Sequence, residues 1–158
     1  SGAGLLVSFQ QEFLCQVKDE CIPLIERHWE EIAINKDRIK LNPDWDAYDL
    51  LEDSGRLTIF TARSSEKLVG YLVVLLNNNI HYKDHVFASN DIIYLHPDYR
   101  KGMTGVKLIK FAEKYLKKDG VSVMVMNTKV HSPFDIILER LGFTPTERLY
   151  SKYIGGNS

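Results

Sequence analysis

The chain has 158 residues, of which 44% are hydrophobic and 26% are charged, and its Lys and Arg residues (20) nearly balance its Asp and Glu residues (21). This size and composition are typical of one globular domain with an ordinary core. The formal net charge of -1 argues against a protein held on nucleic acid or on a membrane by bulk charge. We therefore expect a single domain over residues 5–155, preceded by a cloning scar or flexible tail over residues 1–4.

The two cysteines, Cys15 and Cys21, are interpreted as reduced thiols rather than as a disulfide. A disulfide framework needs more cysteines than two, and reduced thiols fit a reducing compartment. The apolar runs are too short to cross a bilayer, and no segment has the pattern of a secretion signal. The sequence therefore predicts a cytoplasmic protein with no membrane partner.

The first third of the chain is predicted to be helical. Apolar residues recur at helical spacing across residues 9–34, and Pro23 predicts either two helices or one helix interrupted there. A shorter helix is predicted over residues 44–51, with Asn42 or Asp44 as its N-terminal cap.

The middle of the chain changes to strand-like patterning. Runs rich in β-branched or apolar residues predict strands over residues 57–62, 68–76 and 86–95. The Asn-rich segment 77–79 and the polar, aromatic segment 81–85 are predicted to connect the last two of these strands.

Helices and strands alternate in the last part of the chain. The patterns predict a helix over residues 105–118, a strand over 121–128, a helix over 133–141 and a final strand over 148–153. Strands that alternate with helices predict a mixed α/β fold.

The strand that ends at Leu95 leads into a basic, glycine-containing loop that opens a helix. Helix N-termini present free backbone N–H groups that suit phosphate oxygens, and glycines let the backbone approach a ligand closely. Arg100 and Lys101 add charge-assisted bonds to the same oxygens. These residues indicate an anion or phosphate site, with an ordinary basic turn as the alternative.

Residues 95–100, Leu-His-Pro-Asp-Tyr-Arg, and the helix that follows resemble the acetyl-CoA signature of the GNAT superfamily of acyl-CoA N-acyltransferases. Residues 138–143, Leu-Glu-Arg-Leu-Gly-Phe, resemble the family's helix that ends in Leu-Gly-Phe. The resemblance covers residues 57–154 well and the N-terminal third by element order. The first glycine expected in the motif falls on Met103, and the second falls on Gly105. The chain also resembles small acetyltransferase domains of bacteriophage genomes.

The resemblance implies a GNAT-like mixed, mostly antiparallel sheet, flanked by helices and splayed at the strand that ends near Leu95. It implies acetyl-CoA as cofactor, CoA as product, and direct transfer of the acetyl group to a primary amine of a small molecule or protein. The pantetheine is expected on the backbone of this strand and the pyrophosphate on the loop. The expected cofactor-binding residues are Ile93, Tyr94, Leu95, Arg100, Lys101, Gly102, Met103, Thr104, Gly105 and Val106.

Catalytic candidates also follow from the resemblance. Asp91 interrupts an apolar strand near the place where the family often has an acidic residue, so it is the first candidate for the base, with a solvent-facing residue as the alternative. The family's usual thiolate acid is a Tyr at the position that Leu138 occupies. His131 and Tyr150 are the substitutes, although His131 is also suited to a helix cap.

The wall of the acceptor site is expected from two segments. Trp29 and Glu30 lie on the first helical region, and His81 and Tyr82 lie in the connection before the strand of Asp91. A core position is the alternative for Trp29. Two histidines and an aspartate in this connection also invite a metal site, but no matching ligand set exists elsewhere, so no metal is expected.

Two further functions stay open at this point. The substitutions at Met103 and Leu138 favour a catalytically impaired GNAT-like binding module, and the same fold could use a different acyl-CoA. The acceptor is not fixed by the sequence, and the chain is expected to be a monomer or a homodimer.

Overall fold

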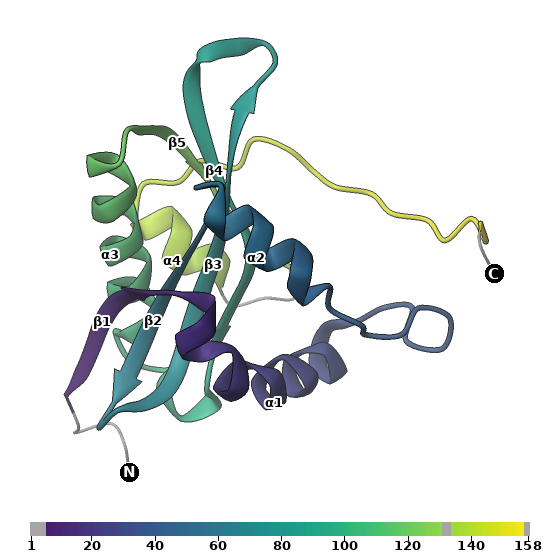
Figure 1. Cartoon of the computed structure of the whole chain (residues 1–158), viewed down its shortest axis with the longest axis horizontal. Helices are drawn as coiled ribbons and strands as arrows, with labels where there is room; N and C mark the ends of the chain where they lie inside the picture. The colour runs from purple at the N-terminus through teal and green to yellow at the C-terminus, as the bar shows by residue number, and fades with distance from the viewer. Residues whose placement is uncertain (1–5, 131–133, 157–158) are drawn as a thin grey trace.

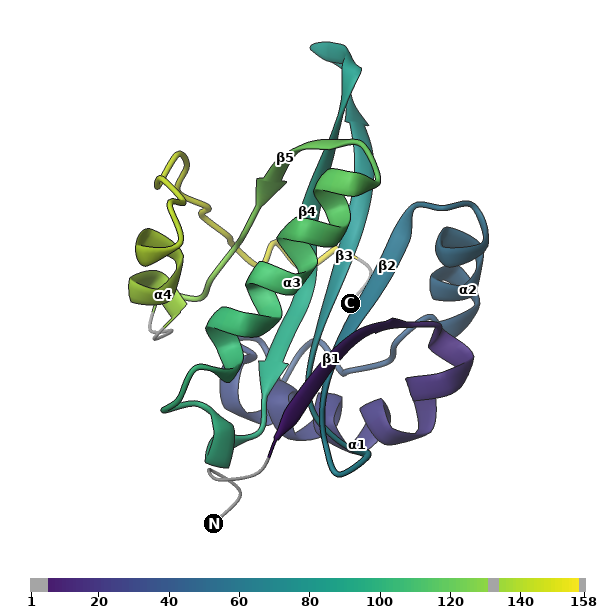
Figure 2. The same ribbon diagram turned by 90° about the vertical axis from the view of Figure 1, so that its left-hand side faces the viewer.

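The computed structural model describes residues 6–130 and 134–156. One five-stranded sheet forms the centre, with α1 and α2 on one face and α3 and α4 on the other (Figures 1 and 2). In chain order the elements are β1 (Val7–Glu12), α1 (Leu14–Ile32), α2 (Trp45–Asp53), β2 (Leu57–Ser64), β3 (Lys67–Asn79), β4 (Tyr82–Leu95), the short 3-10 helix η2 (Pro97–Tyr99), α3 (Thr104–Lys118), β5 (Val121–Val125) and α4 (Phe134–Arg140).

The strands follow one another across the sheet in the order β1-β2-β3-β4-β5. β1 to β4 are antiparallel, and β5 lies parallel to β4 after the crossover through α3. This arrangement confirms the predicted mixed, mostly antiparallel sheet flanked by helices.

Each face of the sheet carries its own apolar core. β3 is buried almost without interruption from Leu68 to Leu76, as expected for a central strand covered on both faces. On one face Leu72 belongs to a core with Leu108 of α3, and on the other face Tyr71 belongs to a core with Val17 of α1. The alternation of side chains along β3 therefore divides one apolar run between two helical layers.

The N-terminal segment departs from the prediction of a helix over residues 9–34. Its first part is β1, which pairs with β2 from Val7 opposite Ser64 to Glu12 opposite Ile59. This segment satisfies the backbone groups along one edge of β2, so long-range pairing overrides the local helical spacing. α1 then runs through Pro23 as one helix, contrary to the expected interruption. The buried Val17 and Cys21 hold α1 on the sheet, which offsets the hydrogen bond that Pro23 cannot donate.

The hairpin between β3 and β4 is longer than predicted. Residues 77–79 belong to β3 and residues 82–85 belong to β4, so the prediction that these residues form connections is wrong. Of the residues predicted to connect the strands, His81 alone lies in the turn. The pairs Asn77 opposite Phe87 and Asn78 opposite Val86 show that backbone pairing continues through polar residues.

The remaining predicted elements agree in type, with one exception. Asp44 caps α2 by accepting a hydrogen bond of 3.0 Å from the Ala47 amide. The predicted strand over residues 121–128 ends at Val125. The predicted strand over residues 148–153 is not formed, and the ribbon there runs outward from the sheet (Figure 1). Across the described parts of the chain, no helix combines the length and apolar character needed to cross a membrane.

Candidate active site

The central feature of the site is the point at which β4 and β5 part. β5 pairs with β4 only from Val86 to Ser89, whereas β4 continues to Leu95 (Figure 2). Just beyond the last pair, the Asn90 side chain accepts a hydrogen bond of 2.6 Å from the Asn127 amide and donates one of 2.9 Å to the Asn127 carbonyl. Asn90 thus makes the last link between the two segments. Within the described residues, the β4 backbone after Asn90 has no strand partner on the β5 side.

Asp91 lies directly after this link, in a β-bulge. Ile92 pairs with Val73 and Asn90 pairs with Val74, so Asp91 is an extra residue in β4. Bulges of this kind redirect a side chain and are frequent beside active sites. The Asp91 side chain is exposed, and its Oδ2 accepts a hydrogen bond of 2.5 Å from the Tyr48 hydroxyl of α2.

Tyr48 is held as a hydrogen-bond donor. Burial raises the pKa of Tyr48 well above its ordinary value of 10.0, and the hydrogen bond to Asp91 raises it further. The Tyr48 hydroxyl therefore keeps its proton at neutral pH and fixes one oxygen of Asp91.

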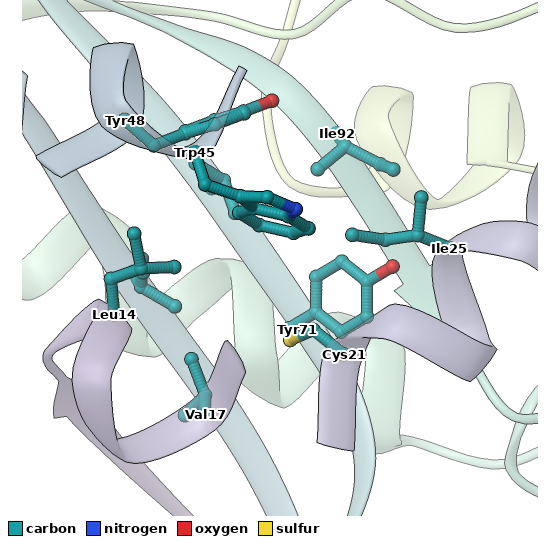
Figure 3. Close-up of a pocket in the computed structure, with 10 residues that line it drawn as sticks. Leu14, Val17, Cys21, Ile25, Trp45, Tyr48, Tyr71 and Ile92 are labelled. Carbon is teal, nitrogen blue, oxygen red and sulfur yellow. The ribbon is translucent and has the colours of Figure 1, made fainter. Parts of the chain in front are cut away.

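An apolar pocket lies beside this pair, between α1, α2 and the sheet. Figure 3 shows the side chains of Trp45 and Tyr48 above that of Tyr71 in this pocket. The hydroxyl of Tyr71 is buried without a hydrogen-bond partner among the described residues. The full lining is Leu14, Val17, Cys21, Ile25, Trp45, Tyr48, Ile59, Tyr71, Val73 and Ile92.

Tyr71 also belongs to a row of three rings with buried polar atoms, formed with Tyr94 and His28. The rings of Tyr71 and Tyr94 are 5.7 Å apart, and the rings of Tyr94 and His28 are 5.4 Å apart. The Tyr94 hydroxyl and His28 Nδ1 also lack partners within the described part of the chain. Burial lowers the pKa of His28, so this imidazole is neutral at pH 7.

The N-terminus of α3 fits a phosphate group. Its N-cap is Met103, whose side chain makes no capping hydrogen bond. The backbone N–H groups of the first turn are therefore left to donate hydrogen bonds to a ligand. Met103 has φ -91°, and the loop therefore does not need a glycine at this position. A Cβ on Gly105 would lie 3.0 Å from Leu95 Cδ1, so Gly105 allows α3 to begin close against the end of β4.

Arg100 is placed differently from the expectation for a phosphate ligand. Its Nε donates to the Leu95 carbonyl at 2.8 Å, and its Nη2 lies 3.3 Å from Glu31 Oε2 on α1. Its guanidinium also lies 5.6 Å from the centre of the Tyr94 ring. In this structure Arg100 thus joins α1 to the end of β4, while the Lys101 side chain is exposed beside the loop.

The expected acceptor-wall residues do not gather around Asp91. His81 and Tyr82 lie at the tip of the β3–β4 hairpin, roughly 30 Å along the strand from Asp91 at the usual rise per residue. Trp29 and Glu30 line an open groove on the outer side of α1, apart from the pocket that Tyr48 lines.

Of the two expected thiolate acids, the structure describes Tyr150 alone. Tyr150 is 84% exposed on the segment that runs outward, and His131 lies outside the described residues. Leu138 is buried in the core beneath α3, so the usual position of the acid is apolar.

Sequence reasoning missed Tyr48, Asn90 and Asn127. Asn90 carries a readable signal, because an Asn-Asp pair interrupts an otherwise apolar strand. Tyr48 and Asn127 belong to no motif, and only the folded chain brings them beside Asp91 and Asn90.

A mostly antiparallel sheet that parts in front of a helix N-terminus is the architecture of an acyl-CoA-dependent acetyltransferase. The match to the family model described as "Acetyltransferase (GNAT) family" extends over residues 22–143. The chain therefore belongs to the GNAT acetyltransferase family, and it is an enzyme of acetyl transfer. This confirms the family predicted from residues 95–100 and 138–143. No curated protein matches the chain in sequence.

Solved structures support the same fold. An aminoglycoside acetyltransferase, meta-AAC0020, from an uncultured soil metagenomic sample in complex with sisomicin has TM-score 0.71 at 14% identity, over 94% of this chain and 95% of the other. The ribosomal-protein-alanine N-acetyltransferase of Brucella melitensis biovar Abortus 2308 has TM-score 0.70 at 19% identity, over 95% and 100%. AAC(6')-Iy in complex with the bisubstrate analogue CoA-S-monomethyl-acetylneamine has TM-score 0.66 at 16% identity, over 94% and 97%.

Proposed function

We propose that residues 5–155 form one catalytic domain that transfers the acetyl group of acetyl-CoA to a primary amine of a small molecule or a protein. The observation that carries this proposal is the parting of β4 and β5 at Asn90, in the strand that leads through η2 into the N-terminus of α3. The structure of AAC(6')-Iy with a CoA bisubstrate analogue supports the choice of cofactor. Free Cys15 and Cys21 fit a cytoplasmic location.

The cofactor would be held by backbone groups. The pantetheine amides would pair with residues 93–95 of β4, which face the gap left by β5. The pyrophosphate would bind the first-turn amides of α3 from Thr104 to Val106, because a helix N-terminus attracts anions. The exposed Lys101 can add charge to this site, whereas Arg100 would first have to leave Glu31.

Asp91 is the proposed base. When bound, acetyl-CoA supplies the thioester carbonyl carbon that the amine attacks, with release of the CoA thiolate. Asp91 accepts the proton that the acceptor nitrogen loses, directly or through one water, and Tyr48 keeps the carboxylate directed toward the acceptor. His131 and Tyr150 stay predictions for the group that protonates the leaving thiolate.

One observation favours the second candidate, a GNAT-like binding module with impaired catalysis. Leu138 is buried in the core, so α4 offers no acid at the usual position. The other sequence argument for this alternative, Met103, is weakened, because the conformation of Met103 suits any residue. An enzyme that uses a different acyl-CoA keeps the same site and is distinguished by the acyl chain that supports turnover.

The test is thermal unfolding with acetyl-CoA, CoA or ATP, followed by thiol release with a panel of primary amines. Ligand at about 100 times its Kd adds roughly 2.7 kcal/mol of stability, a shift of several degrees for a domain of this size. Shifts with acetyl-CoA and CoA but not with ATP, together with amine-dependent thiol release, support the proposal. No shift at millimolar acetyl-CoA overturns it, and binding without thiol release from any acyl-CoA favours the binding module.

A further inference from the structure

The pocket beside Asp91 is lined by uncharged side chains. Its polar members are Cys21, Trp45, Tyr48 and Tyr71, and none of the described residues that line it carries a charge. Burial raises the pKa of Cys21 to about 12 and raises the pKa of Tyr71 well above its ordinary value of 10.0, so both groups keep their protons at pH 7. A charged group that entered this pocket would lose its hydration without gaining an ion partner, which is costly.

The hydroxyl of Tyr71 is the unpaired polar group of this pocket. Tyr71 is 0% exposed, its hydroxyl has no hydrogen-bond partner among the described residues, and Figure 3 shows this hydroxyl directed toward Ile25 across the pocket. The other tyrosine in the lining, Tyr48, donates to Asp91. A buried hydroxyl costs free energy when it is unpaired, so it is usually matched by a partner. Ligand pockets combine apolar walls with a few polar groups of this kind, which orient the ligand.

The pocket adjoins the proposed base. Tyr48 lines the pocket and bonds to Asp91, and Ile92, the residue after Asp91, also lines it. The negative charge of Asp91 contributes to the raised pKa of Tyr71, so the two side chains are near enough to interact. A molecule whose amine meets Asp91 can therefore extend its remaining atoms toward Tyr71.

The size of the pocket limits what can enter it. The pocket encloses about 30 Å³. This volume exceeds the roughly 10–15 Å³ that one water molecule needs, but it is far below the roughly 150 Å³ of a cavity that admits a benzene ring. A short aliphatic chain that ends in one polar atom fits this space, whereas an aromatic or sugar ring does not.

The charged groups around the pocket favour an acceptor with a single positive charge. Asp46, Asp49 and Asp53 of α2 are exposed and do not line the pocket. Their field attracts an ammonium group from solution. The ammonium of Lys18 lies 5.2 Å from the centre of the Trp45 ring, so a positive charge is already present beside the pocket wall. A second ammonium on the acceptor would be repelled there.

We propose that the acceptor is an aliphatic amino alcohol, a primary amine whose short chain carries a hydroxyl that pairs with Tyr71. This inference rests on the proposed acetyl transfer and names the acceptor class of the same site. The acceptor nitrogen forms the amide bond as the C–S bond of acetyl-CoA breaks, and the thiolate leaves with the electron pair. The proton that the nitrogen loses goes to Asp91. The chain lies along Tyr48 and Ile92, and its hydroxyl accepts a hydrogen bond from Tyr71 and stays unmodified.

The first test uses primary amines that differ only at the end of the chain. Propanolamine, butylamine, diaminopropane and β-alanine end in a hydroxyl, methyl, ammonium or carboxylate group, and longer homologues sample the distance to Tyr71. Thiol release from acetyl-CoA gives kcat/KM for each amine. At the best chain length the hydroxyl member should exceed the methyl member by about tenfold or more, because a methyl group leaves Tyr71 unpaired. A hydroxyl member that exceeds none of the others at any chain length overturns the proposal.

Tyr71→Phe separates the hydroxyl from the shape of the pocket. This variant should lower kcat/KM for the best amino alcohol by about tenfold or more, and it should not lower kcat/KM for the methyl counterpart. Tyr115→Phe is the matched control, because Tyr115 belongs to α3 on the opposite face of the sheet, and it should keep the preference. An unchanged preference in Tyr71→Phe overturns the proposal.

The stability of the same variant shows whether the hydroxyl serves the fold instead. An unpaired buried hydroxyl destabilises the free protein, so Tyr71→Phe without ligand should keep its Tm or raise it by about 2–4 °C. A lower Tm together with an equal loss of kcat/KM for every amine would show that the hydroxyl is structural, and it would overturn the proposal.

A binding measurement separates this inference from the proposed acetyl transfer. The chain has two tryptophans, so Trp29→Phe leaves Trp45, in the pocket wall, as the only one. The Trp45 fluorescence of this variant, with and without CoA, should respond to the best amino alcohol at a lower concentration than to its methyl counterpart. If this preference holds and no amine supports thiol release, the proposed acetyl transfer fails and the pocket assignment stands. If amines without a hydroxyl release thiol equally well, acetyl transfer stands and the amino alcohol proposal is overturned.

Discussion

Tyr48 and Asp91 are 43 residues apart in sequence, yet the Tyr48 hydroxyl lies 2.5 Å from Asp91 Oδ2. Two structural features produce this contact. The bulge in β4 adds Asp91 as an extra residue, and α2 packs on the same face of the sheet through Trp45 and Tyr48. An exposed carboxylate that is held by a buried hydroxyl donor is well placed to receive a proton, which is the role proposed for Asp91.

Replacing Asp91 by Asn should reduce kcat by about 100-fold or more, since general base catalysis typically contributes 10²–10⁴-fold. The Kd of CoA should stay within about twofold, because Asp91 is not one of the residues proposed to contact the cofactor. Stopped-flow thiol release and a CoA titration measure the two effects. Unchanged turnover would remove Asp91 from the mechanism.

Tyr48 is a positioning residue if it acts only through Asp91. Tyr48→Phe should lower kcat by roughly tenfold in the wild-type background, and it should have almost no further effect on kcat in Asp91→Asn. Equal losses in both backgrounds would show that Tyr48 acts independently of Asp91. Trp45→Phe serves as the control, because Trp45 lines the same pocket without bonding to Asp91.

The sequence was sufficient for the elements that depend on local pattern. β3, α3 and the Leu95 to Gly105 connection follow from apolar runs, helical spacing and motif residues, and the structure has them within a few residues of the predicted bounds. β1 could not be predicted in this way, because its pairing with β2 depends on residues more than 40 positions away. The same applies to Tyr48, which has no local signal for its role.

The candidate site was predictable where it depends on local sequence pattern, and not where it depends on contacts between distant segments. Asp91 and the helix N-terminus at Met103 are visible as a polar residue in an apolar strand and as a basic loop before a helix. The bonds of Arg100 to Glu31 and to the Leu95 carbonyl depend on where α1 crosses the sheet, which no local pattern specifies. The separation of His81 from Asp91 follows from the length of the hairpin, which was predicted too short.

Gly105 is required for close packing rather than for backbone freedom. In Gly105→Ala the new Cβ would lie 3.0 Å from Leu95 Cδ1 and 3.5 Å from the Phe134 ring, so the free energy of unfolding should fall by about 1–3 kcal/mol. Gly102→Ala is the matched control, because a Cβ there meets nothing within 4 Å, and its change should stay within about 0.5 kcal/mol. Urea unfolding measures both. A larger loss in Gly102→Ala than in Gly105→Ala would contradict this assignment.

Asn90 links β4 to the segment after β5, so its removal should allow these two segments to move apart at the point where β4 and β5 diverge. Asn90→Ala leaves the amide and carbonyl of Asn127 without these bonds, which should cost about 1–3 kcal/mol of stability and weaken the binding of CoA. Asn78→Ala in the exposed hairpin should change neither quantity measurably. Thermal unfolding and a CoA titration provide the comparison, and an unaltered Kd in Asn90→Ala would separate this link from cofactor binding.

The pH dependence of stability should depend on Glu12 and Arg63. Arg63 contacts both Glu12 oxygens, at 2.9 and 3.0 Å, and both side chains are largely buried. Burial alone would raise the pKa of Glu12, but hydrogen bonds from Arg63 and Thr61 lower it on balance below its ordinary value of 4.5. A carboxyl with a lowered folded pKa stabilises the protein above its unfolded pKa, and this contribution is lost as the pH falls through the folded value.

Arg63→Met should therefore lower the free energy of unfolding by about 3 kcal/mol at pH 7, because it leaves the buried Glu12 carboxylate without its charged partner and also removes the bonds of Arg63 to Glu20. The difference between the wild type and this variant should shrink as the pH falls from about 4.5, the ordinary pKa of a glutamate in the unfolded chain, through the lowered pKa of folded Glu12, because the carboxylate that Arg63 stabilises is then lost. Arg56→Met, an exposed arginine bonded to Asn77, should cost less than about 0.5 kcal/mol at any pH. Urea unfolding between pH 3 and pH 8 measures these differences. A gap between wild type and Arg63→Met that stays constant with pH would show that the Glu12 carboxylate does not depend on Arg63.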